Sequence, residues 1–314
     1  MNPATAPTPS ASASASDSAS ASATASPTAA DLSLDAATLD LARAARIYAE
    51  HGCVIVRGLH RHTVAAVAVD VQRATDEAYR LADKAVRSEE GWWLGGNLFI
   101  PAAPGSARER QLMLVGLGYR RSAAMLRAAL EPAACDLAAA ILGPDVELMD
   151  DGQIVSKEPS GGHAKHMHQD SAYFQHAGLG PAACLTYLID TDLVNGALHV
   201  VPGSHRLGYL PHLDTTSHLG LDPQTWSIER GTPIIGKAGD AIFFHQHCIH
   251  GSPSNRSKAA RPVCIHRYRA IGDRIVAHAT TAANRAHSGA DSAAERERAV
   301  QRLVVRGFRT MELA

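Results

Sequence analysis

The sequence predicts an α+β protein with a mainly β core, in which N-terminal helices buttress a barrel of the sandwich or jelly-roll type. Two observations lead to this fold class. In the first half, apolar residues recur at helical spacing. After residue 145, short apolar runs alternate with Gly, Pro, Asn and Asp, which is typical of many short strands joined by turns. No linker separates the two halves, so we expect a single domain over residues 31–314.

Residues 1–30 have a different composition from the rest of the chain. They are almost entirely Ala, Ser, Thr and Pro, and they lack the apolar core of a secretory signal and the arginines of a transit peptide. Such a tract cannot bury enough apolar surface to offset the entropy lost on ordering. We therefore expect a disordered tail that the folded domain does not need.

The first helix is predicted over residues 35–51, because Leu41, Ala44, Ala45 and Tyr48 share one helical face. Gly52 follows as a C-cap, and residues 53–58 form a short apolar run typical of a buried strand.

Two further helices are predicted over residues 63–85 and 122–142. Ser122 is the expected N-cap of the second of these, and Pro132 is expected to kink that helix or to split it in two.

The second half of the chain contributes the predicted strands and one last helix, over residues 291–305. The candidate strands are 146–157, 183–189, 197–201, 233–236, 241–248 and 262–270.

Composition excludes several classes of partner. Lys plus Arg (30) nearly balances Asp plus Glu (31), and no basic run occurs, so we expect neither nucleic acid nor a membrane surface as a partner. No apolar stretch reaches the roughly 18 residues of a membrane span. The five cysteines are odd in number, widely spread and without a CxxC pair, which favours a reducing compartment, and we expect the cytoplasm.

A candidate metal site stands out in the second half. His168 and Asp170 are two apart, so on a strand their side chains share a face, and His250 with Arg261 follows some eighty residues later. Two imidazoles and one carboxylate form the facial ligand set of non-haem Fe(II) oxygenases, which leaves the other coordination positions open. The triplet alone occurs often by chance, but its combination with the distal histidine and the arginine is a strong signal.

Other ligand sets remain open at this point. His166 and His168 form an HxH triplet of the kind that cupins use, and His245 and His247 lie close to His250 in the sequence. The sequence His250-Gly251-Ser252 and its spacing to Arg261 favour His250 as the distal ligand.

With these motifs in order, the chain resembles the phytanoyl-CoA dioxygenase family of Fe(II)/2-oxoglutarate oxygenases over about residues 150–270. The matching stretches are 153–157 with Pro159, 168–174, 195–198 running into 201–205, 239–240 leading to 243–244, and 250–252 leading through 255–257 to Arg261.

This resemblance implies a double-stranded β-helix, a jelly-roll or cupin-like barrel, that uses Fe(II), 2-oxoglutarate and O2. It implies that His168, Asp170 and His250 bind the iron and that Arg261 holds the distal carboxylate of 2-oxoglutarate. An arginine fork makes bidentate bonds to a carboxylate that a lysine cannot copy. If residues 250–261 form two antiparallel strands and their turn, Arg261 returns close to His250.

The resemblance gives three weaker candidates for 2-oxoglutarate contacts, which are Gln153, Thr186 and Ser252. The family often has a Trp just before the position of Thr186, where this chain has Leu185, and the Lys that some members contribute near residue 115 is absent. Halogenating relatives replace the carboxylate of the triad with a small residue. Because Asp170 is present, we expect hydroxylation or another oxidation of a C–H bond, with succinate and CO2 as co-products.

The substrate side of the site is less well defined. The candidates for substrate contact are Tyr173, Phe174, His163, His166, Trp92 and Trp93. No basic cluster indicates a site for the phosphates of coenzyme A, so we favour a small or medium-sized metabolite. The alternatives are an acyl-CoA 2-hydroxylase of the phytanoyl-CoA type and a cupin-like protein that binds metal without turnover. Arg261 separates these classes, because a simple metal-binding module needs no carboxylate fork.

Overall fold

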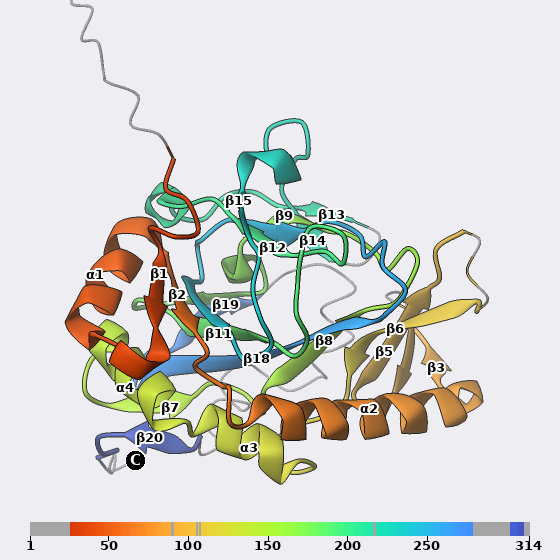
Figure 1. The fold of residues 1–314 in the computed structure, drawn as a ribbon, viewed down its shortest axis with the longest axis horizontal. Helices are drawn as coiled ribbons and strands as arrows, with labels where there is room; N and C mark the ends of the chain where they lie inside the picture. The colour runs from red at the N-terminus through yellow and green to blue at the C-terminus, as the bar shows by residue number, and fades with distance from the viewer. Residues whose placement is uncertain are drawn as a thin grey trace, which may run out of the picture.

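The β core consists mainly of two sheets that face each other (Figure 1). The computed structural model describes residues 26–88, 91–104, 106, 108–215, 218–278 and 302–310. Within these residues, no helix combines the length and the apolar character that crossing a membrane requires.

The larger sheet has 12 strands, most of them antiparallel. Its main path, in order, is β1 (Ser33–Asp35), β2 (Cys53–Arg57), β16 (Ala241–His245), β11 (Ala182–Tyr187), β18 (Arg261–Ala270), β8 (Gln153–Lys157), β6 (Arg110–Val115), β5 (Asn97–Pro101), β4 (Trp92–Leu94) and β3 (Val86–Arg87). Off this path, β7 (Val146–Leu148) pairs with both β18 and β20 (Val304–Arg306).

The smaller sheet has four strands, in the order β15 (Thr232–Ile234), β12 (Leu198–Val200), β17 (His250–Ser252) and β9 (Lys165–His168). Two two-stranded sheets complete the β structure: β10 (Phe174–His176) pairs with the distant β19 (Ile275–His278), and β13 (Leu213–Asp214) pairs with β14 (Leu219–Gly220). In the described part of the chain, backbone hydrogen bonds do not join the two larger sheets into a closed barrel.

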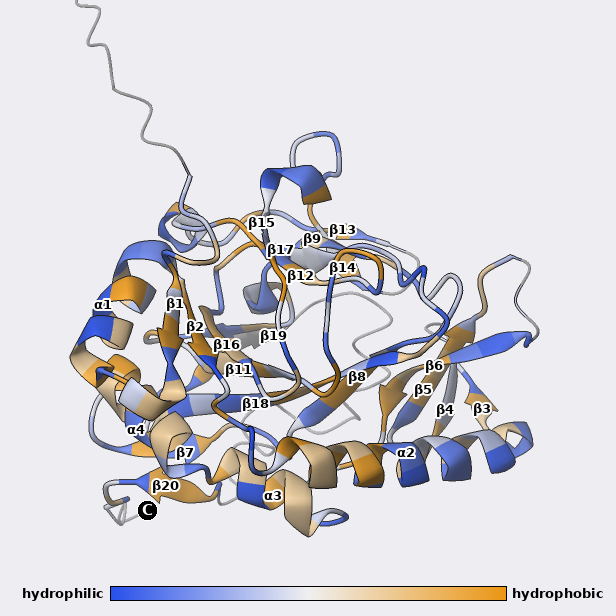
Figure 2. Ribbon diagram, in the orientation of Figure 1, coloured by the Kyte–Doolittle hydropathy of each residue, from blue (hydrophilic) through white to orange (hydrophobic). Residues whose placement is uncertain are grey.

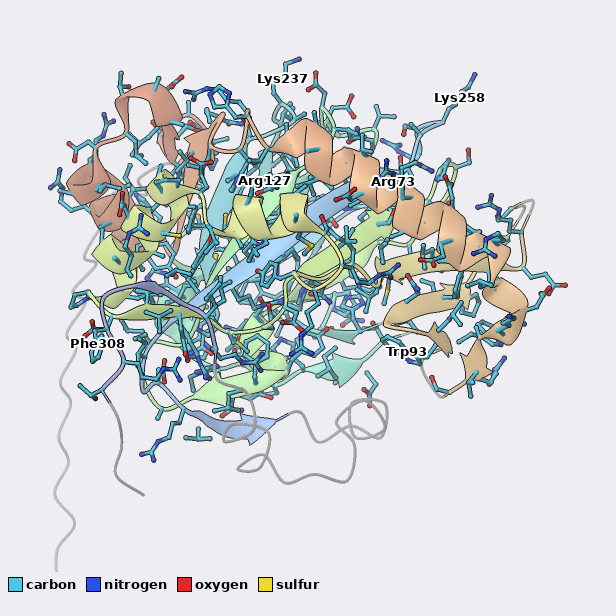
Figure 3. All side chains as sticks on the ribbon, turned by 90° about the horizontal axis from the view of Figure 1, so that it is seen from below. Arg73, Trp93, Arg127, Lys237, Lys258 and Phe308 are labelled. Atoms are coloured by element: carbon cyan, nitrogen blue, oxygen red, sulfur yellow. The ribbon has the colours of Figure 1, made fainter. Side chains whose placement is uncertain are left out.

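The helices cover the outer face of the larger sheet. They are α1 (Leu41–His51), α2 (Val64–Arg80), α3 (Ala123–Ala129) and α4 (Pro132–Leu142). Figure 2 shows that α2 has a hydrophilic and a hydrophobic side. In Figure 3, which views the molecule from the helix side, α2 and α3, with the labelled Arg73 and Arg127, lie in front of the sheet.

Two helix ends follow the predicted caps at Gly52 and Ser122, whereas the start of α1 differs from the prediction. Asp40 accepts a hydrogen bond from the backbone N–H of Arg43, so α1 begins six residues later than we predicted, after β1 and a short 3-10 turn. Gly52 ends α1 with φ of 71°, a left-handed conformation that glycine adopts without strain. The side chain of Ser122 accepts a hydrogen bond from the backbone N–H of Met125 and so caps α3, as predicted.

Pro132 splits the predicted helix over 122–142 in two. Proline lacks the N–H that would continue the helix but suits its first turn, and it stands at the start of α4.

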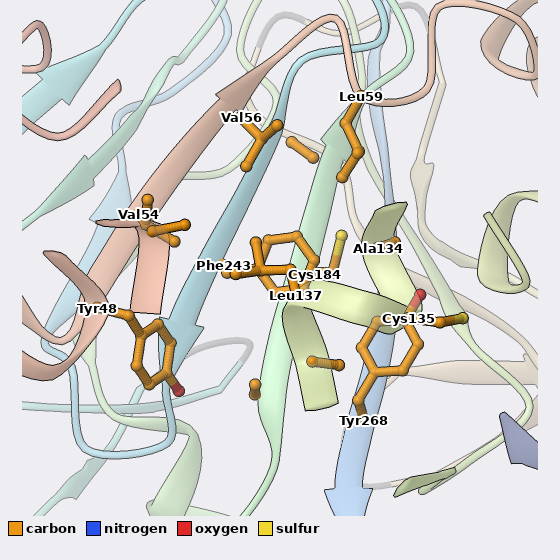
Figure 4. Packing of buried hydrophobic residues seen from close by; sticks show 14 of the residues in the cluster. Tyr48, Val54, Val56, Leu59, Ala134, Cys135, Leu137, Cys184, Phe243 and Tyr268 are labelled. Carbon is orange, nitrogen blue, oxygen red and sulfur yellow. The ribbon is translucent and has the colours of Figure 1, made fainter. Parts of the chain in front are cut away.

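The core between the helices and the larger sheet is built by alternation along the strands. Val54 and Val56 of β2, Phe243 of β16 and Tyr268 of β18 point to the helix side, where they pack with Tyr48 of α1 (Figure 4). The intervening residues point to the other side, so each central strand is buried on both faces.

Residues 26–30, which we assigned to the tail, pack on the domain. Thr232 Oγ1 donates a hydrogen bond to the carbonyl of Pro27 at 3.0 Å. Leu32, two residues after the end of this segment, is fully buried in the core between the sheets. Residues 1–25 lie outside the described part of the chain.

Several predicted strands differ in extent. The strand over 146–157 is two strands, β7 and β8, separated by residues 149–152. The strand over 241–248 ends at His245. Of the last predicted helix, residues 291–301 lie outside the described part, while residues 304–306 form strand β20 and not a helix.

Candidate metal centre

Three side chains converge where the two halves of the sequence motif meet. His168 ends β9, Asp170 follows in a short 3-10 turn, and His250 begins β17, directly opposite His168 in the antiparallel pair. All three are buried, and one nitrogen or oxygen atom from each lies within 4.8 Å of the others. The imidazole centroids are 4.2 Å apart, and Nε2 of His250 is 3.8 Å from Oδ1 of Asp170.

The protonation of the two imidazoles suits a metal. Nδ1 of His168 lies 2.8 Å from the carbonyl of His166, and Nδ1 of His250 lies 2.9 Å from the carbonyl of Cys248. A carbonyl only accepts, so each Nδ1 carries the proton and each Nε2 keeps a lone pair. Burial, and then the neighbouring His250, lowers the pKa of His168, and burial also lowers the pKa of His250, which favours the neutral, ligating forms.

The alternative ligands lie elsewhere. His166 is exposed and stacks on His218, with 5.6 Å between the ring centroids. His247 bonds through Nδ1 to Ser171 Oγ at 2.8 Å, and His245 packs against Tyr48. Among the described residues, His168, Asp170 and His250 are the only group of three or more His, Cys, Asp or Glu side chains whose ligand atoms lie close enough together to hold one metal ion.

The triad opens into a cavity of about 520 Å³ between the two sheets. Its lining combines apolar side chains from both sheets with a few polar groups, which is typical of small-molecule sites. The polar groups therefore set what the cavity can bind.

Arg261 lies at the edge of this cavity as a buried cation. Its Nη2 donates to the carbonyl of Gly196 at 2.9 Å and lies 3.5 Å from Ser252 Oγ, while its Nε has no partner. Burial lowers the pKa of Arg261 to about 10, so the group stays charged at neutral pH. No carboxylate of the described residues forms an ion pair with Arg261, which leaves this charge available to an anionic ligand.

The path from His250 to Arg261 differs from our expectation. Strands β17 and β18 do not pair with each other, because β17 belongs to the smaller sheet and β18 to the larger one. The turn carries the chain across the cavity, and Arg261 reaches Ser252 from the opposite wall.

The other predicted 2-oxoglutarate contacts fall on different faces. Gln153 and Ser252 line the cavity. Thr186 does not, because it lies on the same side of β11 as Cys184, which packs beneath the helices, whereas Leu185 between them lines the cavity.

Half of the predicted substrate residues line the cavity, namely Tyr173, Phe174 and Trp93. The other three are placed outside its lining. Trp92 makes cation–π contacts with two arginine side chains, His163 bonds through Nε2 to the carbonyl of Pro101 at 2.8 Å, and His166 is exposed.

Two buried cations are among the cavity residues that the sequence did not predict. Lys157 is buried, and its Nζ donates to the carbonyls of His163 and Ser252. Arg267 is buried beside Asp170, with 3.5 Å between Nε and Oδ2. A signal for both exists in the two-residue period of a strand, because Lys157 shares a face with Gln153, and Arg267 shares one with Arg261.

Comparisons with known proteins agree with this geometry. The peroxisomal phytanoyl-CoA dioxygenase of Rattus norvegicus is 25% identical over 239 residues, which are 73% of this chain and 68% of that protein. The L-proline trans-4-hydroxylase of Streptomyces griseoviridis is 28% identical over 166 residues, 45% of this chain and 60% of that protein.

A similar fold occurs in the crystal structure of the epimerase SnoN in complex with Fe3+, alpha ketoglutarate and nogalamycin RO. Its TM-score is 0.54 at 22% identity, covering 80% of this chain and 91% of that one, and it confirms the jelly-roll fold class. The model of the phytanoyl-CoA dioxygenase (PhyH) family matches residues 48–263, which include the triad and Arg261. The chain therefore belongs to the phytanoyl-CoA dioxygenase family.

Proposed function

We propose that this protein binds Fe(II) through His168, Asp170 and His250 and oxidises a C–H bond of a small or medium-sized metabolite. The family membership makes the reaction class that of a non-haem Fe(II)/2-oxoglutarate-dependent oxygenase. The single observation that carries the assignment of the ligands is the buried convergence of two neutral imidazoles and one carboxylate on a cavity.

Each residue of the cavity has a distinct task in this proposal. Bound Fe(II) would supply the redox chemistry that couples O2 and 2-oxoglutarate to substrate oxidation, with succinate and CO2 released. Arg261 binds the distal carboxylate of 2-oxoglutarate with charge-assisted hydrogen bonds, and Ser252 beside it orients the fork. The apolar walls, including Leu185 and Phe244, exclude water from the reacting groups.

The cavity supports a compact substrate. Its apolar lining near Trp93, Leu98 and Met113 would receive the carbon skeleton, and Tyr173 and Phe174 would border the substrate near His168. The L-proline hydroxylase among the relatives acts on a small molecule, as its name states. An acyl-CoA substrate of the phytanoyl-CoA type is the alternative within the same reaction class, and the rat relative favours it.

A cupin-like protein that binds metal without turnover is the remaining alternative. Arg261 argues against it, since burying an unpaired guanidinium is costly and a pure metal site has no use for it. We also propose that residues 31–314 form one domain, and that the protein works in a reducing compartment such as the cytoplasm. All five cysteines are buried and free, which supports this location.

Anaerobic titration tests the proposal without knowledge of the substrate. Fe(II) and then 2-oxoglutarate are added to the purified protein while the weak metal-to-ligand charge-transfer absorption is followed. We expect one equivalent of each to bind, and the absorption to be absent in Asp170→Ala. Failure of the unmodified protein to develop this absorption would overturn the proposed function.

The presence of Asp170 also sets the reaction type. With substrate and excess chloride, we expect mass spectrometry to find a gain of one oxygen or a loss of two hydrogens. A chlorinated product would contradict the placement of Asp170 at the metal.

A further inference from the structure

Arg267 connects the candidate metal centre to two other polar groups of the cavity. Its Nε lies 3.5 Å from Oδ2 of Asp170, its Nη1 donates to Oδ2 of Asp150 at 3.0 Å, and its Nη2 donates to Oε1 of Gln153 at 3.2 Å. Each of the three guanidinium nitrogens thus faces a different side chain. Because the guanidinium is planar and rigid, the hydrogen bonds of Nη1 and Nη2 fix its orientation and leave Nε facing Asp170 in an ion pair without a hydrogen bond.

The two oxygens of Asp170 face different neighbours. Oδ1 lies 3.8 Å from Nε2 of His250, on the side of the imidazoles. Oδ2 lies on the side of Arg267. A carboxylate held in this way presents one oxygen to a cation between the imidazoles and keeps the other on the guanidinium.

We propose that Arg267 is a positioning residue that makes Asp170 a ligand through one oxygen only. This inference rests on the proposed function, because it takes Asp170 as a metal ligand. Two imidazoles and one carboxylate oxygen leave three positions of an octahedral ion open. If Asp170 used both oxygens, two positions would remain, 2-oxoglutarate would need both, and O2 would have none.

The charges around Arg267 are compatible with a metal dication nearby. Two carboxylates share this one cation, so the group of three carries a net negative charge. Asp150 thereby offsets the repulsion that an isolated arginine would exert on the metal.

The chain offers a matched control on the same strand. Arg269, two residues further along β18, is also buried and pairs with Glu147 at 2.7 Å, but it does not line the cavity. Arg267→Met and Arg269→Met each remove one buried arginine that pairs with acidic side chains, and the two arginines have similar exposure. A general loss of stability affects both variants, whereas an effect on the metal centre is expected only in the first.

Co(II) is a suitable probe, because its visible absorption bands depend on coordination number and need no turnover. We expect the unmodified protein and Arg269→Met to give the same Co(II) spectrum. Arg267→Met should give shifted bands, and its Co(II) form should bind 2-oxoglutarate about tenfold more weakly, the lower end of the effect of groups that hold a metal ligand.

Two milder variants keep the test decisive if Arg267→Met does not fold. In Arg267→Lys a single ammonium can hold only one of the two carboxylates, so the spectrum should lie between the other two. Asp150→Asn loosens the anchor of Arg267 and should shift the bands in the same direction.

Two results would overturn the inference in different ways. Spectra that superimpose on the unmodified one in every folded variant, with 2-oxoglutarate affinity within twofold, would remove the positioning role of Arg267 and leave the proposed function intact. Failure of the unmodified protein to bind Co(II) would contradict the proposed function itself, and this inference with it.

Discussion

Lys157 and Arg261 occupy paired positions on the adjacent strands β8 and β18, and both contact Ser252. Both side chains are buried, and among the described residues no carboxylate forms an ion pair with either. Keeping both groups charged this close together is unfavourable without an anion. A ligand carboxylate at this end of the cavity would stabilise the charged forms of both, and this is where the proposal places 2-oxoglutarate.

Arg261→Lys should weaken 2-oxoglutarate binding. The variant keeps the charge but loses the fork, and the loss of one charged hydrogen bond costs about 1.5–3 kcal/mol, roughly ten- to hundredfold in Kd. Anaerobic titration of the Fe(II) protein measures this constant. Arg256→Lys, in the same turn but exposed, is the control, and equal constants in the two variants would remove Arg261 from the site.

Binding of 2-oxoglutarate should take up a proton at Lys157. Burial, then Arg261 and Lys165, lower the pKa of Lys157 well below its usual value, and an incoming carboxylate raises it again. Above the lowered pKa, the affinity should therefore fall as the pH rises. Calorimetry in two buffers of different ionisation enthalpy counts the protons. The uptake should vanish in Lys157→Met and persist in Lys258→Met, at an exposed site; uptake unchanged in Lys157→Met would contradict this assignment.

His250→Ala should abolish stoichiometric Fe(II) binding, whereas His247→Ala should retain it. Only the first of these imidazoles converges with His168 and Asp170, while the second bonds to Ser171. Metal analysis after anaerobic desalting gives the iron content, and circular dichroism checks the fold. Retention of iron in His250→Ala together with its loss in His247→Ala would reverse the choice of ligand.

Stability should fall as the pH drops from about 6.5 towards 3. Burial lowers the pKa of His266 to about 3, so between these values the unfolded chain binds a proton that the folded chain excludes. One such group contributes about 1.4 kcal/mol for each pH unit. In His266→Gln the slope of the unfolding free energy against pH should be shallower by that amount, and in His62→Gln, at an exposed site, unchanged. Equal slopes in both variants would contradict the assignment to His266.

Leu32→Ala should lower the free energy of unfolding by about 2–5 kcal/mol, as for other fully buried leucines. Denaturant unfolding measures this change. Leu193→Ala, at an exposed site, is the control, and equal losses in the two leucine variants would contradict the packing of Leu32.

A chain that begins at residue 26 should match the full chain in denaturant unfolding. A chain that begins at residue 31 loses the hydrogen bond between Thr232 and Pro27 and should be slightly less stable.

The parts of the fold that local sequence determines were predicted well. The caps at Gly52 and Ser122 and the break at Pro132 depend on a few adjacent residues, and all three are confirmed. The spacing of His168 and Asp170 is likewise local. The convergence of these residues with His250 is long-range, and it was predicted from the combination of motifs and from the resemblance to a family, since no local pattern indicates it.

The errors arose where pairing between distant segments decides the structure. Strand β20 forms because Val304 pairs with Glu147, which no local pattern near residue 304 indicates. Strand β17 pairs with β9 and β12 and not with β18, because the turn crosses between sheets. Whether Thr186 faces the cavity depends on which face of β11 meets the helices. Every residue of β11 is buried, so the pattern of apolar residues along the strand does not indicate that face.

Strand β18 carries both Arg261, at one end of the cavity, and Arg267, beside Asp170. In the proposed function, one continuous β-strand therefore fixes the separation between Arg261, which would bind the distal carboxylate, and the metal side of the site, at about 3.3 Å of rise per residue. Neither end can shift without moving the other. The strand thus selects the length of the dicarboxylate that fits the site. A dicarboxylate longer by one methylene would not fit between the metal side and Arg261, because Arg261 cannot move independently of Arg267.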